Sequence, residues 1–533
     1  MRTILLTWLV LGCLIATASL GAAGDDKKQD KKRKPKFTIN KETTYVTEAV
    51  DADGFIDYPA ALNERLKKGV TPENNAYVLL VKAMGPHPEG STMPPEFYRW
   101  LGIRPPSEKG EYFVAARQFL KAQYDEKNPD FFDDSIDQAS QRPWTARQRP
   151  DLAEWLKANE KPLALAVEAA GRPQFFYPLV PGKSKDGSPA GLIGALVPGV
   201  QKCRDLAQAL SIRAMLSIGE ERWDDARRDL LALHRLGRLL GRGGTLIEFL
   251  VGVAVESIAC DRDLVLLASP KLNAAKIIAY QRELQDLPPR STVADKLDLG
   301  ERFMFLDSTM LIARGGFPFL ESLASPGANP KTPNPAQKTI LDNIDWDPAL
   351  RNGNRYYDRM VASLRIKERS EREKEAEALD IEIKDVKAKL FMKSPIEKLG
   401  SLFFPLGFTA NARGKFIGDI LISLLMPAHR KVQQAADRIE QIEQNLHIAF
   451  ALAGYQRDIG SYPPRLDALT PKYLKEIPLD LFTGRPLIYQ PAKNGYLLYS
   501  VGVNGKDDGG QGYNDNPPGD DLVVRMPLPE LRK

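Results

Sequence analysis

Oxygen-bearing side chains crowd a glycine-rich stretch near the carboxyl end of the chain. The set comprises Asn504, Asp507, Asp508, Asn514, Asp515, Asp520 and Asp521, with five glycines among them. Carboxylate and amide oxygens on a flexible loop suit Ca²⁺, which accepts about six to eight oxygen ligands in adaptable geometry. We expect the ligands to be Asp507, Asp508, Asp520, Asp521 and Asn504. The alternative is a solvated turn in which these residues serve only the backbone geometry.

Short β-strands must hold this loop in place. Ile488-Tyr489 and Tyr496 to Val501 are rich in residues that favour strands, and Asn494-Gly495 between them is a strong hairpin signal. Leu522 to Val524 is a third short strand, so the oxygen-rich loop lies between the second and third strands. The sequence therefore predicts a small antiparallel sheet.

A helix precedes these strands, and together the helix and strands carry a series of motifs from Ala428 to Arg525. The helix ends Ala-Leu-Ala-Gly-Tyr-Gln-Arg-Asp-Ile-Gly (451–460) and is followed by Ser-Tyr-Pro-Pro (461–464). The later motifs are Leu466, Asp467, Leu469, Tyr473-Leu474, Ile477-Pro478, Asp480, Thr483-Gly484-Arg485-Pro486, Ile488-Tyr489 and Tyr499-Ser500-Val501-Gly502. In this order they resemble the globular part of type II secretion pseudopilins, especially the major pseudopilin. The resemblance covers about a fifth of the chain.

The resemblance implies a small α+β module with a structural calcium site in the acidic loop. The match is incomplete, because Asn504 stands where the family usually has Asp and residues 514–519 lengthen the loop. The leader and the Glu-containing apolar helix of a pilin are also missing. Gly407-Phe408-Thr409 only echoes the leader junction, and Ala412 stands at the Glu position. We therefore expect a shared module and not the assembly role of a pilin.

The rest of the chain lacks the short motifs of common enzyme classes. Its histidines, His87, His234, His429 and His447, form no His-Glu-x-x-His pair. Cys-x-x-Cys, Gly-x-Ser-x-Gly and phosphate-loop motifs are also absent from the sequence. We interpret His234 and His447 as packed or capping side chains, and we expect no cofactor besides calcium. The alternative is an exported hydrolase that uses carboxylates, such as Asp133 and Asp134, in a cleft of the helical part.

The chain begins with the features of an exported protein. A short basic start is followed by the uncharged apolar residues 4–20 and by Gly21-Ala22-Ala23, which suits signal peptidase. We predict a signal peptide of residues 1–23, cleaved near Ala23, and a periplasmic or extracellular location. The alternatives are a retained membrane anchor and a lipoprotein that is lipidated at Cys13.

The basic charge of the chain is concentrated just after the predicted signal peptide. Asp25 to Lys36 carries a net charge of +4 against +5 for the whole chain, so the residues after them are nearly neutral. A basic face for nucleic acid is therefore not expected on the folded part. Residues 24–40 should be a disordered tether. Its role is either peripheral contact with anionic lipid head groups or simple solubilisation.

Two cysteines, Cys203 and Cys260, remain after signal cleavage. An oxidising compartment permits a disulfide between them, whereas sequence spacing cannot place their Cα atoms. Two alternatives remain for these residues: a Cys203–Cys260 disulfide or two buried free thiols.

Near the start of the folded part, Asp51-Ala52-Asp53-Gly54 resembles part of an EF-hand loop. The register fails, because Ala49 and Ala60 would occupy ligand positions, so we predict a turn.

Residues 41–322 should form an α-helical domain. Its predicted helices are Thr71–Met84 with Thr71 as N-cap, Ala115–Tyr124, Asp151–Gly171, Cys203–Ile218, Trp223–Leu240, Thr245–Ala268 and Leu272–Gln285. The pair Cys203–Ile218 and Trp223–Leu240 resembles one tetratricopeptide-type helix pair. No second copy at a fixed period follows, so the domain is either compact or a degenerate solenoid.

The second half of the chain contains two helices with heptad spacing. Residues 323–345 are rich in Pro, Ser, Gly and Asn and should be a linker. Residues 346–427 include a charged helix whose apolar positions are Ala376, Leu379, Ile383, Val386 and Leu390, followed by a partly apolar segment. The second heptad pattern, Val432 to Ala453, lies in residues 428–533, which we call the C-terminal module.

These patterns predict a mainly α fold, with a multi-helix body followed by the small α+β C-terminal module. The function that they favour is that of an exported, non-enzymatic envelope protein. It would contact protein partners through the helical body and the module, without binding nucleic acid.

Overall fold

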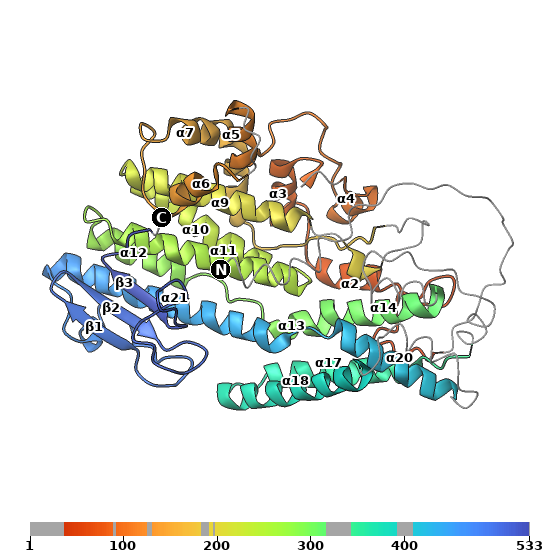
Figure 1. Ribbon diagram of the computed structural model, residues 1–533. Helices are drawn as coiled ribbons and strands as arrows, with labels where there is room; N and C mark the ends of the chain where they lie inside the picture. The colour runs from red at the N-terminus through yellow and green to blue at the C-terminus, as the bar shows by residue number, and fades with distance from the viewer. Residues whose placement is uncertain are drawn as a thin grey trace. The chain divides into compact units, whose positions relative to one another are not determined.

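The computed structural model describes residues 37–88, 92–124, 130–182, 191–195, 198–315, 343–391 and 409–531. The predicted signal peptide, Cys13, the tether up to Lys36 and most of the linker 323–345 lie outside these ranges. The described chain is mainly helical and ends in a small antiparallel sheet (Figure 1). This confirms the predicted fold class at the level of its elements. Among the described residues, no helix is both long and apolar enough to cross a membrane.

Contacts divide the chain into two units that alternate along the sequence. The first unit contains Met1–Arg65, Pro181–Ala195 and Leu297–His429, and the second contains Leu66–Val180, Leu196–Lys296 and Arg430–Lys533. Part of the predicted domain 41–322 shares the first unit with residues 346–427, whereas the C-terminal module joins the helices of the second unit.

Helices dominate the first unit. Its elements are α2 (Tyr58–Lys67, of which the last two residues fall in the second unit), η2 (Leu192–Gly194), η3 (Leu297–Glu301), α14 (Arg302–Gly315), α17 (Asp347–Leu364), α18 (Arg369–Phe391) and α20 (Ala410–Leu425). Helices α17, α18 and α20 pack against one another (Figure 1). Of the predicted heptad residues of α18, Ala376, Leu379, Ile383 and Leu390 are buried, whereas Val386 is half-buried.

A buried arginine organises the core of the first unit. The Arg302 side chain is 1% exposed and forms ion pairs of 2.8 Å with Asp298 and with Asp358. Its guanidinium group also lies 4.2 Å from the centre of the Tyr45 ring. Carboxylates and an aromatic face together offset the cost of burying this charge, because an unpaired buried cation would be strongly destabilising.

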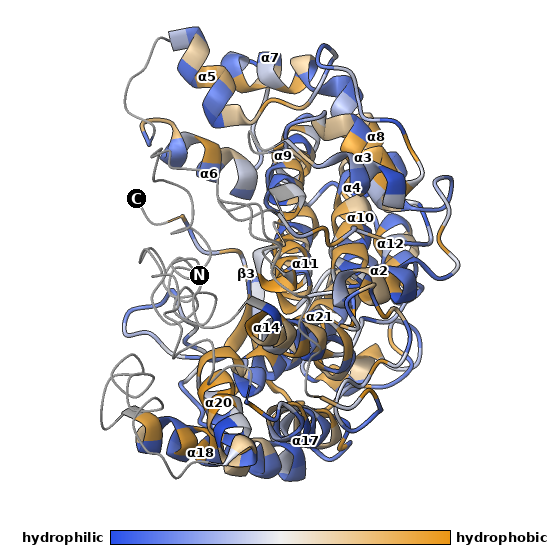
Figure 2. Cartoon of the chain, turned by 90° about the vertical axis from the view of Figure 1, so that its right-hand side faces the viewer, coloured by the Kyte–Doolittle hydropathy of each residue, from blue (hydrophilic) through white to orange (hydrophobic). Residues whose placement is uncertain are grey.

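The second unit is built around three long consecutive helices, α9 (Pro198–Gly219), α10 (Trp223–Leu240) and α11 (Leu246–Leu267). All three carry many buried hydrophobic residues, and α10 and α11 show orange segments in Figure 2. The other helices are α3 (Ala76–Met84), α4 (Pro95–Leu101), α5 (Ala116–Tyr124), α6 (Asp133–Gln141), α7 (Pro150–Ala158), α8 (Glu160–Ala170), α12 (Ala274–Gln285), α13 (Val293–Lys296) and α21 (His429–Ile459).

Local capping explains where several of these helices begin. Thr245 and Glu248 form a reciprocal capping box at the start of α11, close to the predicted boundary. The N-cap of α3 is Asn75 and not Thr71, because the Asn75 side chain accepts the Tyr77 N–H. The predicted helix 151–171 is divided into α7 and α8 at Asn159, whose side chain bonds to Val114. The structure contains the predicted pair α9–α10 but does not establish a tetratricopeptide arrangement.

The C-terminal module combines α21 with a three-stranded sheet in the order β1-β2-β3. Strands β1 (Ile488–Ala492), β2 (Gly495–Ser500) and β3 (Leu522–Met526) are antiparallel, and η4 (Leu466–Leu469) precedes them. The side-chain amide of Asn445 on α21 donates to the Leu522 carbonyl at 2.8 Å. On the same helix, Phe450 packs edge-on against Tyr280 of α12 at 5.4 Å between ring centres. Helix α21 is therefore bonded to the sheet and packed against the helical part of the second unit.

Candidate metal site in the C-terminal loop

The antiparallel pairing of β2 and β3 brings the two ends of the acidic loop together. Ser500 at the end of β2 is opposite Leu522 at the start of β3, so residues 501–521 form one connection. Carboxylate oxygens of Asp508, Asp520 and Asp521 lie within 4.8 Å of one another. Within the described part of the chain, these three residues form the group with the spacing of a metal site.

A glycine permits the close approach of the two loop ends. Gly502 has a φ of +69°, and a Cβ at this position would lie 2.2 Å from the Asp520 carbonyl oxygen. Any other residue would be strained in this conformation and would also displace the backbone at Asp520. The glycine content that marked the loop in the sequence thus has a specific steric role here.

Backbone N–H groups orient the three carboxylates. Asn504 donates to Asp520 Oδ2 at 3.0 Å, Asp520 donates to Asp508 Oδ2 at 3.0 Å, and Gly510 donates to Asp521 Oδ2 at 2.8 Å. Asp520 Oδ1 is buried and has no hydrogen-bond partner. A buried acceptor without a partner is costly, so this oxygen is available to a cation.

The pKa of Asp521 reflects repulsion between neighbouring carboxylates in this loop. Burial raises the pKa of Asp521 above its ordinary value, and the neighbouring Asp508 and Asp507 carboxylates add to this rise. The N–H groups of Gly510 and Asp508 oppose it. A divalent cation would relieve the repulsion by favouring the ionised form of all three acids.

The other two predicted ligands have different partners. Asp507 accepts hydrogen bonds from the Tyr499 hydroxyl at 3.0 Å and from the Gly509 N–H at 2.8 Å. The Asn504 side chain accepts the Lys506 N–H at 2.6 Å, so Asn504 reaches the cluster through its backbone. The structure therefore brings together Asp508, Asp520 and Asp521 and places Asp507 and Asn504 as neighbours that shape the loop.

Sequence reasoning missed an arginine on β3 that pairs with this loop. The Arg525 guanidinium group on β3 pairs with Asp515 at 2.8 Å and also bonds to the Gly510 carbonyl oxygen. Asp515 is thus neutralised by the protein itself, and the loop is fastened to the sheet. The alternation of side chains along β3 could have placed Arg525 on one face of the strand, but it could not reveal its partner.

The residues present fit a calcium ion. Three clustered carboxylates, one unpartnered buried oxygen and a glycine-rich backbone supply hard oxygen donors in an adaptable loop. Asp508, Asp520 and Asp521 would hold the ion, and its charge would offset their repulsion. Such an ion would stiffen the β2–β3 connection.

The cysteines are separate buried thiols in the structure. Cys203 on α9 and Cys260 on α11 are both buried, and no disulfide joins them. Of the two possibilities, the structure has two buried thiols and not the Cys203–Cys260 disulfide. Burial raises the pKa of the Cys260 thiol well above its ordinary value, which disfavours the reactive thiolate.

The other residues considered for chemistry have partners within the protein. Asp133 lies in the first turn of α6 and pairs with Arg117 at 2.6 Å. Asp51 accepts the N–H groups of Asp53 and Phe55, as expected for a turn, and pairs with Arg314. His87 is exposed and pairs with Glu108 at 2.6 Å, whereas His234 is buried and bonds to Asp263 at 2.7 Å.

Comparison with known proteins identifies no relative of the chain: no protein-family model, curated protein or solved structure matches it.

Proposed function

We propose that the protein is an exported, non-enzymatic envelope protein that contacts other proteins through its C-terminal module. In this proposal the module is pseudopilin-like, and a calcium ion held by Asp508, Asp520 and Asp521 stiffens it. The observation that carries the proposal is the convergence of these three carboxylates, one with an unpartnered buried oxygen, at the β2–β3 connection. The signal-peptide pattern of residues 1–23 supports export.

The architecture of the module also supports this function. Its loop lies between two paired strands, and its helix α21 is bonded to the sheet through Asn445. A loop that a cation stiffens loses less conformational freedom when a partner binds, so the contact is stronger for the same interface. The helical part of the second unit would then hold the module in place.

A calcium-dependent interaction is the first expected outcome. Thermal unfolding of the mature protein should shift upward in about 1 mM Ca²⁺ relative to chelator, with a stabilisation of about 1–3 kcal/mol by mass action. Cross-linking in intact cells should give adducts with envelope proteins that decrease when calcium is removed. Asp508→Asn should abolish the thermal shift and weaken the adducts, because it removes a ligand carboxylate.

Asp467→Asn is the matched control. Asp467 is an exposed acid of the same module that pairs with Arg465. This variant should retain both the shift and the adducts. A thermal shift without any change in cross-linking would reject the proposed contact while leaving the ion site intact. Recovery of the protein from the cytoplasm with Met1 still attached would reject export.

A further inference from the structure

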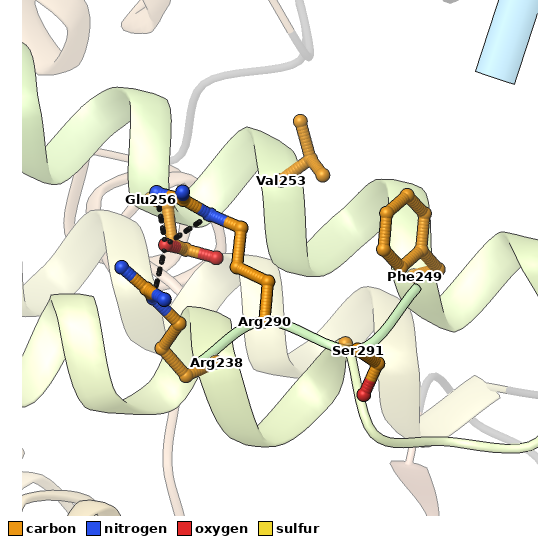
Figure 3. Close-up of a pocket in the computed structure, with 7 residues that line it drawn as sticks. Arg238, Phe249, Val253, Glu256, Arg290 and Ser291 are labelled. Carbon is orange, nitrogen blue, oxygen red and sulfur yellow. Dashed lines mark hydrogen bonds and ion pairs between the residues drawn. The ribbon is translucent and has the colours of Figure 1, made fainter. Parts of the chain in front are cut away.

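A small cavity between α10 and α11 is closed by ion pairs. Figure 3 shows Arg238 and Arg290 converging on Glu256, at 2.6 and 2.8 Å. The same two arginines pair with Glu443 of α21. The space that remains beside them holds about one water molecule. This cavity therefore cannot admit a substrate or a peptide, and a partner of that size would have to bind at the surface.

Helix α18 of the first unit carries a second stripe of side chains on its outer face. The helix packs against α17 and α20, and its buried heptad residues face that way. On the opposite side, other residues recur at the same spacings of three and four, and all of them are exposed. This spacing is typical of helices that pack side by side. The exposed stripe consists of Glu371, Lys374, Ala378, Ile381, Asp385 and Ala388.

Ile381 is the apolar centre of the exposed stripe. Its side chain is 53% exposed, and it lies near the middle of the 23-residue helix. Ala378 and Ala388 lie on the same stripe, and their small side chains would let another helix approach closely. A second helix on this face would therefore remove the isoleucine from water, which is favourable.

Charge is distributed unevenly along α18. Residues 369–382 contain three basic and six acidic residues, a net charge of −3, whereas residues 383–391 contain three basic residues and one acidic residue, a net charge of +2. Such a helix complements a second copy of itself that runs antiparallel, because the acidic half of each copy then faces the basic half of the other.

The antiparallel arrangement also matches charges residue by residue. If Ile381 packs against Ala378 of the second copy, the heptad spacing brings Lys374 opposite Asp385 of the second copy. Two-fold symmetry repeats each of these contacts. In a parallel pair each of these charged residues would instead face its own counterpart, and like charges repel. The stripe therefore favours the antiparallel orientation.

The residues at the two edges of the stripe are compatible with this register. On one edge, Glu377 would lie beside Lys384 of the second copy, and both positions are exposed. On the other edge, Glu375 would lie beside Glu382 of the second copy. Glu382 already pairs with Arg359 of its own chain at 2.5 Å, so its charge is compensated there.

We propose that the protein forms an antiparallel dimer through the outer faces of α18, so that a second copy of the chain covers the exposed stripe. The contact is small, with one large apolar side chain from each copy, and its charges stay close to solvent. The dimer therefore forms reversibly and weakens as the salt concentration rises. It does not depend on the calcium-dependent contact proposed above.

Sedimentation velocity of the full mature protein tests this dimer at about 5–200 µM protein, in about 20 mM and about 500 mM NaCl. The dimer fraction should rise with protein concentration at low salt and fall at high salt. Lys374→Glu places two acids opposite each other, and Asp385→Lys places two lysines opposite each other. Each variant alone should therefore weaken dimerisation about tenfold or more.

A mixture of the two variants is the decisive measurement. In the mixed dimer every facing pair again has opposite signs, so an equimolar mixture of Lys374→Glu and Asp385→Lys should associate as the wild-type protein does. This recovery also shows that both variants are folded. Lys41→Glu, at an exposed lysine outside α18, makes the same change in net charge as Lys374→Glu and should leave the dimer unchanged.

Three results would overturn the proposal. The first is a protein that stays monomeric at low salt up to about 200 µM, which would leave the stripe to a different partner. The second is a dimer that neither single variant weakens, because it would use another surface. The third is a mixture of the two variants that stays monomeric although the wild-type protein dimerises.

Discussion

Asp307 shows what burial does to a single acidic residue in the first unit. The side chain is buried and accepts the Leu192 N–H at 2.6 Å. Burial raises its pKa to about 7, and the nearby Asp57 adds to this, whereas the Leu192 N–H and Arg314 oppose it. Sequence position alone gave no indication of this, because Asp307 lies in an ordinary helical segment. Its hydrogen-bond donor, the Leu192 N–H, is distant in the sequence.

The first unit should lose stability through Asp307 as the pH rises. Because the folded pKa lies above the ordinary value of 3.8, this contribution is fully present below pH 3.8 and is lost as the pH rises through about 7. Asp307→Asn keeps an oxygen for the Leu192 N–H and cannot ionise. Protection of α14 amides from exchange at pH 8 should therefore increase, by on the order of 2 kcal/mol.

Asp385→Asn, at an exposed acid on α18, is the control and should not change α14 protection at either pH. The interpretation fails if Asp307→Asn and the wild-type protein respond identically to pH between 5 and 8.

At the scale of elements, one helix contact in the first unit depends on the absence of a side chain. A Cβ at Gly414 of α20 would lie 1.8 Å from the Asp345 carbonyl oxygen, just before α17. Gly414→Ala should therefore push α20 away and destabilise the first unit by about 1–3 kcal/mol. The measurement is the denaturant midpoint for exchange of α17 and α20 amides, with an unchanged slope.

Lys415→Ala tests whether any substitution at this point of α20 has the same effect. Lys415 is the next residue and is exposed, so its replacement should change stability by less than about 0.5 kcal/mol. Equal destabilisation by both variants would mean that the close approach at Gly414 is not the cause.

The elements themselves were largely readable from local patterns. The helices α9, α10, α11 and α12 and the strands of the C-terminal module lie close to where periodicity and turn residues predicted them. The division between α7 and α8 has a local cause, since Pro162 lacks the N–H that would bond to the Ala158 carbonyl oxygen. The N-cap of α3 was misplaced for a different reason: the Asn75 side chain bonds to the backbone of Phe176, a distant partner that no pattern of local spacing reveals.

At the scale of the whole molecule, the C-terminal module depends on the helical part of the second unit. Glu443, Phe450 and Arg457 of α21 all have partners outside residues 428–533. A fragment of residues 428–533 should therefore unfold with little cooperativity, because it exposes an apolar and charged helix face. Its thermal unfolding by circular dichroism, measured beside the full mature protein, is the test.

Co-expression of that fragment with residues 37–427 should restore a cooperative transition and co-purification, since the missing partners are then supplied. Cooperative unfolding of the fragment alone, at the temperature of the full protein, would show instead that the module is self-sufficient.

The sequence by itself determined the helical class, the three strands and an oxygen-rich loop between the last two. These features follow from local periodicity and turn chemistry, which depend on neighbouring residues. Tertiary structure alone decided which carboxylates converge, since Asp508 meets Asp520 and Asp521 only through the pairing of β2 with β3. It also decided that Asp515 forms an ion pair with Arg525 and that Glu443 forms ion pairs with two arginines. Burial and partners of this kind arise between segments that are far apart in the chain, so no local pattern encodes them.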